Sequence, residues 1–318
     1  MNLKNDLMFK KEYLELYLKD GEEIFEFNYE KNGYYFYNIS IKRPIKKIGS
    51  FNINEKIYDL ESVYGYGGYL TNGDEKFINE ALKRYKEYCQ NQYIVAEFIR
   101  FHPFNDFPKE LLDFNLIERQ VIVKNLEDND IMRSFNSKTR YYVKKALKDI
   151  KIEKSNNIEK FLELYYFTMS KNKASDFYYF DKRYFEKLIS LPGVELYACI
   201  FNNEIIAMSF FIFSKYGYYH LSANSEVSYK LGANYALLYY GFEVAKSKNI
   251  KYFILGGGTT NNQNDSLFKF KKKFSNLIKP FYIGGMIFDE DKYKYLNTLW
   301  NKQFKKDVKY FLKYRLEK

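Results

Sequence analysis

IFEFNYEKNGYYFYNISIKR (24–43) and ELYACIFNNEIIAMSFFIFS (195–214) repeat one local pattern in the two halves of the chain. Each stretch contains two apolar, aromatic runs, which are separated by Asn32-Gly33 in the first and by Asn202-Asn203 in the second. Asn and Gly tolerate the backbone angles of a tight hairpin turn, and β-branched and aromatic residues favour strands. The sequence therefore predicts a β-hairpin in each half.

The segments after the two hairpins follow the same order. A glycine-containing loop leads to an amphipathic helix, at about 75–90 or about 232–248, and then to a strand at 93–101 or 251–257. We therefore expect an α/β fold with mixed sheets (α+β) and two domains of similar plan, 1–125 and 126–318, joined near LEDND (126–130). The last helix is a candidate to pack back on the first domain.

Length and composition narrow the class of protein. At 318 residues the chain is long enough for two domains, and its charge of +11 favours phosphates, nucleic acid or an anionic membrane face as partners, although a solvated lysine surface is the more common explanation. The chain has neither an apolar signal core at its start nor a run long enough to span a membrane, so we expect a cytoplasmic protein. Cys89 and Cys199 lack CxxC spacing and indicate neither a disulfide framework nor a zinc ribbon.

RYYVKKALKDI (140–150) predicts a helix with one apolar and one cationic arc. The cationic arc contains Arg140, Lys144, Lys145 and Lys148, and the apolar arc contains Val143, Ala146, Leu147 and Ile150. An ordinary solvated face is the more common explanation of such an arc, and contact with phosphates or nucleic acid is the alternative.

LGGGTTNNQNDSLFKFKKKF (255–274) predicts a strand that ends in glycines, a polar loop, and a helix capped by Asn264 or Asp265. Its spacing matches neither a Walker A loop nor a dinucleotide fingerprint. On a helical wheel Lys271 lies inside the apolar arc formed by Leu267, Phe270 and Phe274, whereas Lys269, Lys272 and Lys273 point elsewhere. A lysine at such a position either extends its ammonium to the rim or lines a cavity that requires a positive charge.

Other candidate site residues lie near strand ends. VYGYGGYL (63–70) offers Tyr64 and Tyr66, and RFHP (100–103) offers Arg100 as an anion clamp and His102 as an acid–base group. A tight loop, an ion-paired arginine and a structural histidine are the plainer explanations of these residues.

The second half supplies another histidine. Strand alternation places Tyr218, His220 and Ser222 on one face of 216–225. We expect no metal site, because the two histidines lie in different domains without a carboxylate cluster.

Six motifs together resemble the FemAB/FemX-like branch of the GNAT acyltransferases, which includes peptidoglycan-bridge and polysaccharide-linked acyltransferases. The motifs are YGYGG (64–68), RFHP (100–103), TRYYVKKALK (139–148), YHLSANS (219–225), LGAN (231–234) and LGGG with DSLFKFKKKF (255–274). The resemblance runs from about residue 24 to about residue 300, and it implies two tandem GNAT-like domains.

The resemblance also implies a function, namely transfer of an acyl group onto an amino group of a cell-envelope precursor or nucleotide-linked sugar. The implied donor is aminoacyl-tRNA or acyl-coenzyme A, and a lipid-linked precursor at a membrane surface is a further implied partner. The lysine of the FKxxF element, here Lys271 beside Phe270, is implied to stabilise the oxyanion. His220 is our first candidate for the general base, with Glu97 and Asp265 after it.

The binding residues are divided between the domains. The donor is expected at Ser222, Gly232, Asn234, Gly256, Gly257, Gly258 and Asp265 in the second domain, and the acceptor in a groove between domains with Tyr64, Tyr66, Arg100 and His102 on one wall.

Two departures from the family leave the donor open. SEVSYKLGAN (225–234) lacks the full [RQ]xxGx[GA] pyrophosphate pattern, which argues against coenzyme A, and the coiled-coil arm of some Fem enzymes is missing, which argues against tRNA. The alternatives are therefore an acetyl-coenzyme-A-dependent sugar N-acetyltransferase and, more distantly, a non-catalytic carbohydrate- or RNA-binding relative.

Overall fold

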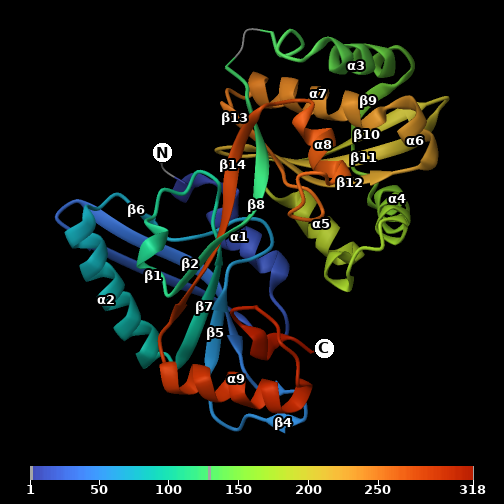
Figure 1. Ribbon diagram of the computed structural model, residues 1–318. Helices are drawn as coiled ribbons and strands as arrows, with labels where there is room; N and C mark the ends of the chain where they lie inside the picture. Colours follow the sequence, from blue (N-terminus) through green and yellow to red (C-terminus); the bar gives the residue numbers. More distant parts are fainter. Residues whose placement is uncertain (1–2, 128–129, 318) are drawn as a thin grey trace. The chain divides into compact units, whose positions relative to one another are not determined.

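The computed structural model describes residues 3–127 and 130–317, which form two compact units (Figure 1). Unit 1 contains the described residues up to Glu118 together with those from Phe281 onward, and unit 2 is Arg119–Pro280. The expected domains, 1–125 and 126–318, differ from these units because the C-terminal segment belongs to unit 1. Residues 128 and 129 of the expected join lie outside the described residues.

Unit 1 contains a mixed sheet flanked by helices. Its strands, in spatial order, are β1 (Glu23–Lys31), β2 (Tyr34–Pro44), β5 (Tyr58–Glu61), β7 (Ile94–Arg100) and the part of β14 (Leu277–Ile287) from Phe281 onward, with β6 (Leu70–Thr71) beside β2. A small separate sheet pairs β3 (Lys47–Ile48) with β4 (Phe51–Asn52). The helices are α1 (Lys11–Leu14), α2 (Glu75–Asn91) and α9 (Glu290–Phe304), with short 3₁₀ turns at Leu3–Asn5, Leu7–Phe9, Glu15–Tyr17, Lys109–Leu111 and Lys313–Arg315.

Unit 2 contains a second mixed sheet. Its strands, in spatial order, are the part of β8 (Phe114–Asn125) from Arg119 onward, β13 (Tyr252–Gly256), β12 (Gly217–Asn224), β11 (Glu204–Phe213), β10 (Val194–Phe201) and β9 (Lys151–Ser155). The helices are α3 (Ser137–Asp149), α4 (Ile158–Lys171), α5 (Lys182–Ser190), α6 (Glu226–Leu231), α7 (Ala233–Ser247) and α8 (Ser266–Lys272), with a 3₁₀ turn at Asp176–Tyr178.

The two sheets follow the same plan. In unit 1 the hairpin β1–β2 is followed by antiparallel β5, parallel β7 and antiparallel β14. In unit 2 the hairpin β10–β11 is followed by antiparallel β12, parallel β13 and antiparallel β8. The helices α2 and α7 connect the parallel strands in the two units. The predicted duplication of plan is therefore confirmed, and so is the predicted mixed α/β fold class.

Both predicted hairpins are confirmed, and their turn residues explain them. Asn32 and Gly33 have φ angles of 52° and 82°, and Asn202 and Asn203 have φ angles of 49° and 63°. Two consecutive residues with positive φ give a turn whose twist matches that of the adjoining strands. The strands accordingly pair up to the turn, Lys31 with Tyr34 and Phe201 with Glu204.

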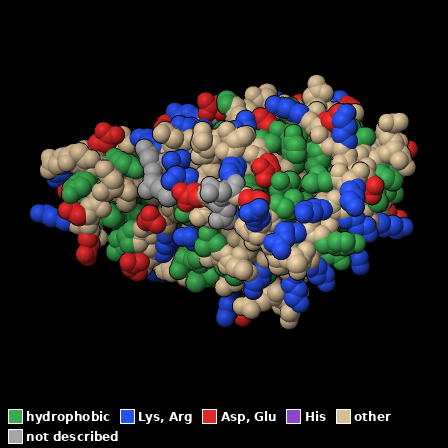
Figure 2. Space-filling model, turned by 90° about the horizontal axis from the view of Figure 1, so that it is seen from above, with side chains coloured by type: hydrophobic (Ala, Val, Ile, Leu, Met, Phe, Trp, Pro, Cys, Tyr) green, Lys and Arg blue, Asp and Glu red, His purple; other side chains and the backbone are tan. Residues whose placement is uncertain are grey.

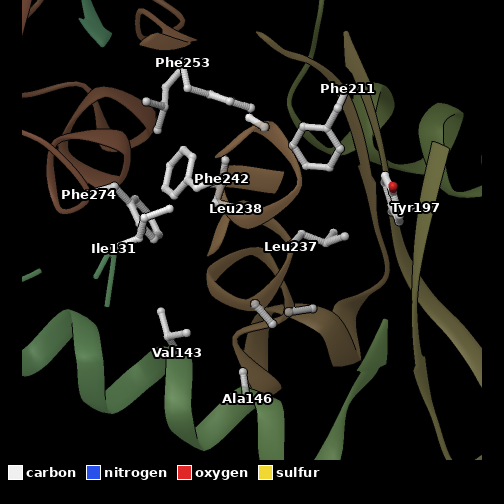
Figure 3. Packing of buried hydrophobic residues seen from close by; sticks show 14 of the residues in the cluster. Ile131, Val143, Ala146, Tyr197, Phe211, Leu237, Leu238, Phe242, Phe253 and Phe274 are labelled. Atoms are coloured by element: carbon white, nitrogen blue, oxygen red, sulfur yellow. The ribbon is translucent and has the colours of Figure 1, made fainter. Parts of the chain in front are cut away.

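The core of unit 2 contains α7, which packs between the sheet and α3 (Figure 3). Leu237 and Phe242 of α7 are fully buried together with Phe211 of β11, and Val143 and Ala146 of α3 cover the other side of α7 (Figure 3). The opposite face of the sheet is covered by α4 and α5. The rings of Phe161 (α4) and Phe185 (α5) contact Phe210 of β11 there.

One detail of the α3 prediction is wrong, whereas the helix predicted at about 75–90 is present as α2. Leu147, which was expected on the apolar arc of α3, is 38% exposed, because α7 covers only the arc around Val143 and Ala146. In unit 1, α2 packs Ala81 and Tyr85 on one side of the sheet, and Trp300 of α9 packs with β7. Within 3–127 and 130–317, no helix combines the length and apolar character needed to cross a membrane.

Candidate active site

The strands β12 and β13 of unit 2 are paired over a very short distance. Gly217 pairs with Phe253 and Tyr218 with Ile254, after which β12 continues beside β11 as far as Asn224 and β13 continues beside β8 as far as Gly256. The two parallel strands therefore diverge after Tyr218. Where two strands separate in this way, the backbone N–H and C=O groups that each strand directs toward the other have no strand partner. A ligand can therefore bind to these groups.

Unit 1 differs at the equivalent position. Its parallel strands β5 and β7 pair as far as Glu61 with Phe98, and Gly67 of the YGYGG segment then bridges to Phe101. The Gly67 N–H donates to the Arg100 carbonyl at 2.7 Å, and the His102 N–H donates to the Gly67 carbonyl at 3.0 Å. The chain itself therefore occupies in unit 1 the place that stays open between β12 and β13 in unit 2.

Lys271 of α8 reaches the β12–β13 divergence. Its side chain is buried, with 7% of its surface exposed, and its Nζ donates to the carbonyl of Gly257 at 2.7 Å. The same Nζ lies 5.9 Å from the ring centre of Tyr219, which is the first β12 residue beyond the paired part. The helical-wheel prediction that Lys271 points into an apolar face is therefore confirmed, whereas Lys269, Lys272 and Lys273 are exposed.

The ammonium of Lys271 retains hydrogen-bonding capacity. An ammonium has three N–H donors, and in the part of the chain that the structure describes the bond to Gly257 is the one hydrogen bond that Nζ makes. Burial lowers the pKa of Lys271 to about 7; the nearby Asp265 carboxylate opposes this shift and the Arg119 guanidinium adds to it. Near neutral pH this side chain is therefore divided between the ammonium and the neutral amine, and the ammonium has two donors for a ligand oxygen.

The loop between β13 and α8 fixes the position of Lys271. Gly256 has a φ of +80°, and a Cβ at this position would lie 3.3 Å from the Lys271 Nζ. At Gly258 a Cβ would lie 2.4 Å from Oδ1 of Asp265, so the close approach of loop and cap requires glycine. Arg119 donates from Nη1 to the Gly258 carbonyl at 2.9 Å.

Asp265 is the N-cap of α8, as predicted, and it also holds the loop. Its Oδ1 accepts from the Phe268 N–H at 3.0 Å, and its Oδ2 accepts from the N–H groups of Thr259 and Thr260, both at 3.1 Å. Burial alone would raise the pKa of Asp265, but the hydrogen bonds from Thr259 and from the backbone outweigh it and lower the pKa to about 2. Its two oxygens thus accept hydrogen bonds from both the loop and the helix.

Phe270 supports α8 from its other side. Its ring meets the ring of Tyr235 of α7 edge to face at 5.1 Å, and the Lys273 Nζ donates to the Tyr235 hydroxyl at 2.8 Å. Phe270 therefore packs α8 on α7, and its geometry is that of a positioning residue for Lys271.

The structure places His220 away from Lys271. The predicted alternation holds for Tyr218 and His220 and is wrong for Ser222. A bulge at His220 lets Tyr219 and Leu221 pair with the consecutive residues Phe211 and Phe210, so that Ser222 lies opposite Ser209 on the face of Tyr219. The His220 Nε2 lies 3.1 Å from the hydroxyl of Tyr184 on α5.

Two faces of the sheet thus separate the candidate residues. Tyr219 lies on the α7 face beside Lys271, whereas His220 contacts α5 on the opposite face. Burial lowers the pKa of His220 to about 3, so its imidazole is neutral at physiological pH.

The other expected donor residues lie on β12 and at the start of α7. The Ser222 Oγ accepts a hydrogen bond from the Ser209 Oγ at 2.9 Å. Gly232 ends α6 and begins α7 with a φ of 72°. The Oδ1 of Asn234 is buried without a hydrogen-bond partner in the described part of the chain.

The four expected acceptor residues lie in unit 1, where several make structural contacts. Arg100 donates to the Ser62 carbonyl at 2.8 Å and to the Glu61 carboxylate at 2.6 Å. His102 is 1% exposed, and its Nδ1 accepts from the Phe104 N–H at 3.1 Å. Burial lowers the pKa of His102 to about 3.

The two tyrosines of YGYGG also contact other residues of unit 1. The ring of Tyr66 packs edge to face on His102 at 5.3 Å, and the carbonyl of Tyr64 accepts from the Tyr13 hydroxyl at 3.1 Å. The structure therefore brings Tyr66 and His102 together and uses Arg100 in an ion pair.

Glu97, the second candidate for a general base, is completely buried in unit 1. Its oxygens accept from the Asn38 amide at 2.8 Å and from the hydroxyls of Ser40, Tyr69 and Tyr85 at 2.6–2.7 Å. Burial raises the pKa of Glu97, although the four hydrogen bonds oppose this shift. This geometry is that of a core polar network.

Two residues of the site were not predicted from the sequence, namely Arg119 and Tyr219. Arg119 bonds to a residue 139 positions away, so no local pattern could indicate it. Tyr219 lies within the YHLSANS motif on the face opposite Tyr218 and His220, as alternation places it, but the candidate residues were chosen from the other face.

Comparison with known proteins defines the fold. No protein-family model and no curated protein matches this chain. Among solved structures, a crystal structure of FemX matches 92% of this chain and 94% of its own, with a TM-score of 0.69 and 14% sequence identity. The C-terminal domain of a putative lysylphosphatidylglycerol synthetase from Agrobacterium fabrum matches 85% of each chain, with a TM-score of 0.52 and 11% identity. The L-PGS structure from Bacillus licheniformis matches 90% of each chain, with a TM-score of 0.51 and 14% identity.

These findings and the two compact units describe a protein built from two α/β units of similar plan, as the sequence predicted. More specifically, the chain has the fold of FemX, and the predicted resemblance to the FemAB/FemX-like branch is confirmed at the level of the fold.

Proposed function

We propose that this protein is an N-acyltransferase that transfers an aminoacyl or acetyl group to an amino group of a cell-envelope precursor or nucleotide-linked sugar. The observation that carries the proposal is the buried ammonium of Lys271 at the β12–β13 divergence, with donors left for a ligand oxygen. The fold of FemX supports the same class of reaction. The similar lysylphosphatidylglycerol synthetase domain is the reason to keep an acceptor at a membrane surface within the proposal.

The chemistry follows from the charge that develops during acyl transfer. A neutral acceptor amine attacks the acyl carbon, and the carbonyl oxygen becomes an oxyanion in the tetrahedral intermediate. Collapse of the intermediate breaks the bond from the acyl carbon to the donor's oxygen or sulfur, and the donor leaves as the alcohol or thiol after taking up the proton that the amine loses. A cation fixed at that oxygen in a dry environment lowers the barrier by several kcal/mol. Lys271 meets this requirement because Gly257 and the α8 cap hold its side chain before the reaction begins.

The test is the variant Lys271→Met. Since one fixed donor to an oxyanion is worth about a hundredfold or more in turnover, we expect a loss of that size in acyl transfer while the fold survives. The control is Lys302→Met, which removes one exposed lysine of unit 1 and should leave turnover unchanged. Normal turnover by a folded Lys271→Met protein would refute the proposed role.

An acetyl-coenzyme-A-dependent sugar N-acetyltransferase is the second candidate. It is favoured by Gly232, which begins the long helix α7 at the LGAN motif, where the resemblance places the GNAT pyrophosphate loop. Thermal melting with acetyl-coenzyme A and with free coenzyme A separates the donors, because a ligand at about a hundred times its Kd adds about 2.7 kcal/mol to stability. A clear upward shift identifies coenzyme A as the donor carrier, and no shift at saturating concentrations favours aminoacyl-tRNA.

A further inference from the structure

Unit 1 has a pocket of about 740 Å³ near the start of β7. Residues of four segments line it, namely the connection before β5, the last two turns of α2, the start of β7 and the junction of β14 with α9. Figure 1 shows the end of α2 beside the start of α9, where the Gln90 side chain donates to the Phe288 carbonyl at 2.7 Å. The volume is that of a small-molecule site. All the lining residues belong to unit 1, whereas Lys271 belongs to unit 2.

The lining combines a buried apolar part with charged side chains. The buried apolar residues are Ile57, Ile94, Val95 and Phe288. The charged residues are Glu55, Lys86, Asp289, Glu290, Asp291 and Lys292. Charged side chains of both signs also cover the face of the molecule drawn in Figure 2, so charge by itself does not mark a site. Here the charges accompany a hollow with an apolar part, which is the usual construction of a ligand pocket.

Four of the six charged side chains have partners that hold the pocket together. Lys292 of α9 forms an ion pair with Glu55, which connects α9 to the segment before β5. Asp289 caps α9, since its Oδ1 accepts from the Lys292 N–H at 2.9 Å. Glu290 pairs with Lys294 one turn later, at 3.1 Å. These contacts fix the walls of the pocket and occupy four of its charges.

Three polar groups of the lining are available to a ligand. Within 3–127 and 130–317, the Lys86 ammonium, the Asp291 carboxylate and the Tyr93 hydroxyl make neither a hydrogen bond nor an ion pair. Lys86 is half-buried, and Tyr93 is 64% exposed. A partly buried ammonium loses hydration, and a carboxylate on a ligand restores the lost interactions through a charge-assisted hydrogen bond.

Tyr93 has an unfavourable backbone conformation. Its φ is 57°, in the left-handed region, where a bulky side chain is uncommon. Two hydrogen bonds hold it there, because the Tyr93 N–H donates to the Gln90 carbonyl and the Tyr58 N–H donates to the Tyr93 carbonyl, each at 3.0 Å. Residues held in such conformations cluster at ligand sites. Here the strained residue contributes an aromatic ring to the lining.

The charges of the pocket select a ligand that carries both signs. A carboxylate suits Lys86, and an ammonium suits Asp291. The lining has four carboxylates and two ammonium groups, so a second cation on the ligand is favoured over a second anion. The face of the Tyr93 ring attracts a cation, and guanidinium groups make this contact more often than ammonium groups do. A free basic amino acid carries this set of groups, namely one carboxylate and two cations.

Other charged metabolites fit the lining less well. A polyamine supplies cations alone and leaves Lys86 beside a like charge. A nucleotide brings phosphates to a lining with an excess of carboxylates. A neutral amino acid can pair with Lys86 and Asp291 but leaves that excess without a partner.

We propose that this pocket binds a free basic amino acid, with its carboxylate at Lys86 and its two cations at Asp291 and at the ring of Tyr93. The inference goes beyond the proposed function, because the pocket belongs to the other unit and binding needs no acyl transfer. A ligand held there would connect α2, β7 and α9, so it should stabilise unit 1 against unfolding.

The experiment measures binding of L-arginine to the full chain by titration calorimetry. Two analogues isolate the groups of the ligand: L-citrulline replaces the guanidinium by a neutral group of nearly the same shape, and agmatine lacks the carboxylate. We expect L-arginine to bind at one site per chain. Each analogue should bind about tenfold more weakly, because it loses one hydrogen-bonded charge.

Two variants assign the charged groups. Lys86→Gln should weaken binding of L-arginine about tenfold and should not weaken binding of agmatine, which has no carboxylate for Lys86. Asp291→Asn should weaken binding of both. The matched controls are Lys83→Gln, on α2 outside the lining, and Asp307→Asn, after α9, and both should bind L-arginine as wild type does.

Tyr93→Gly separates binding from folding. Glycine adopts a φ of 57° without strain, so the melting temperature should change little although the ring is lost. Binding of L-arginine should nevertheless weaken about fivefold, since the contact between guanidinium and ring is removed.

The outcomes separate this inference from the proposed function. Absence of L-arginine binding at millimolar concentration would overturn the inference, and so would tighter binding of agmatine than of L-arginine, or equal binding of L-arginine by Lys86→Gln, Asp291→Asn and wild type. Lys271→Met should bind L-arginine normally. If Lys271→Met also transferred the acyl group normally, the proposed function would fail and the amino-acid pocket would stand.

Discussion

Lys271 combines a useful charge with a cost in stability. Its pKa is lowered by burial from the ordinary 10.5 to about 7, so the folded state binds a proton less readily than the unfolded state. The protonated side chain therefore destabilises the fold, fully so below about pH 7, and this destabilisation fades as the pH rises from about 7 toward 10.5. Residues of active sites often destabilise the folded state in this way.

The resulting prediction concerns stability. Lys271→Met, the variant expected to lose activity, should melt at a higher temperature than wild type near neutral pH, because the methionine fills the apolar site without a charge. The difference should shrink at alkaline pH, where wild-type Lys271 is neutral in both states. Thermal unfolding followed by circular dichroism across this pH range measures both effects. A variant that melts lower than wild type at every pH would show that the bond to Gly257 outweighs the burial of charge.

Single residues also show how far the sequence could predict the site. The 3.6-residue period of a helix was sufficient to place Lys271 among Leu267, Phe270 and Phe274, because those residues are neighbours in the chain. Arg119 was missed because its partner, the Gly258 carbonyl, is brought near only by the pairing of β8 with β13. Local patterns identified Lys271 as a candidate site residue, and tertiary pairing supplied its surroundings.

At the scale of the element, α8 is a short helix whose position depends on its cap. Asp265 bonds to Phe268 at the first turn of α8 and to Thr259 and Thr260 in the preceding loop, so one carboxylate connects the two. Its lowered pKa means that this stabilisation is present above the ordinary pKa of 3.8 and is lost as the pH falls toward about 2.

Asp265→Ala should therefore affect both stability and activity. Loss of an N-cap costs about 1 kcal/mol, and we expect turnover to fall in addition because the start of α8 no longer fixes Lys271. The control is Asp74→Ala, which removes the equivalent cap of α2, where Asp74 accepts from the Phe77 N–H at 2.8 Å. Denaturant unfolding and steady-state kinetics on both variants test the prediction. An equal loss of turnover in the two variants would contradict it.

Elements also differ in how well the sequence predicted them. The hairpins were predictable since Asn-Gly and Asn-Asn are local turn signals, and α2, α3 and α7 followed from their apolar period. The bulge at His220 was not, because an extra residue in a strand leaves the apolar composition unchanged. The bridge from Gly67 to Phe101, which closes the strand divergence in unit 1, likewise depends on contacts between distant segments.

At the scale of the whole molecule, the chain returns to its first unit at the end. β14 pairs with β7, and the C-terminal segment after α9 brings Arg315 to Asp59 of β5. The sequence analysis proposed such a return for the last helix alone. The return of β14 could not be predicted, since no local pattern shows which unit a strand joins. It follows that the stability of unit 1 depends on residues at both ends of the chain.

Asp59 connects the C-terminal segment to the sheet of unit 1. Its carboxylate is completely buried and bonds to Arg43 Nε at 2.8 Å and to Arg315 Nε at 2.6 Å. Burial alone would raise the pKa of Asp59, but the two guanidinium groups outweigh it and lower the pKa. The carboxylate therefore stabilises the fold above the pKa of the unfolded chain, and this contribution is lost as the pH falls through the lowered pKa.

Asp59→Asn should destabilise unit 1 by about 3–5 kcal/mol, because it leaves the charges of Arg43 and Arg315 without their buried partner. Hydrogen exchange locates the effect, and we expect faster exchange in β2, β5 and the turn Lys313–Arg315, with little change in unit 2. The control is Glu127→Gln, which breaks an exposed pair with Lys251 and should change the exchange of neither unit. Exchange that rises to the same degree in both units would show that the two unfold as one cooperative body, and the effect of Asp59 would then belong to the entire chain.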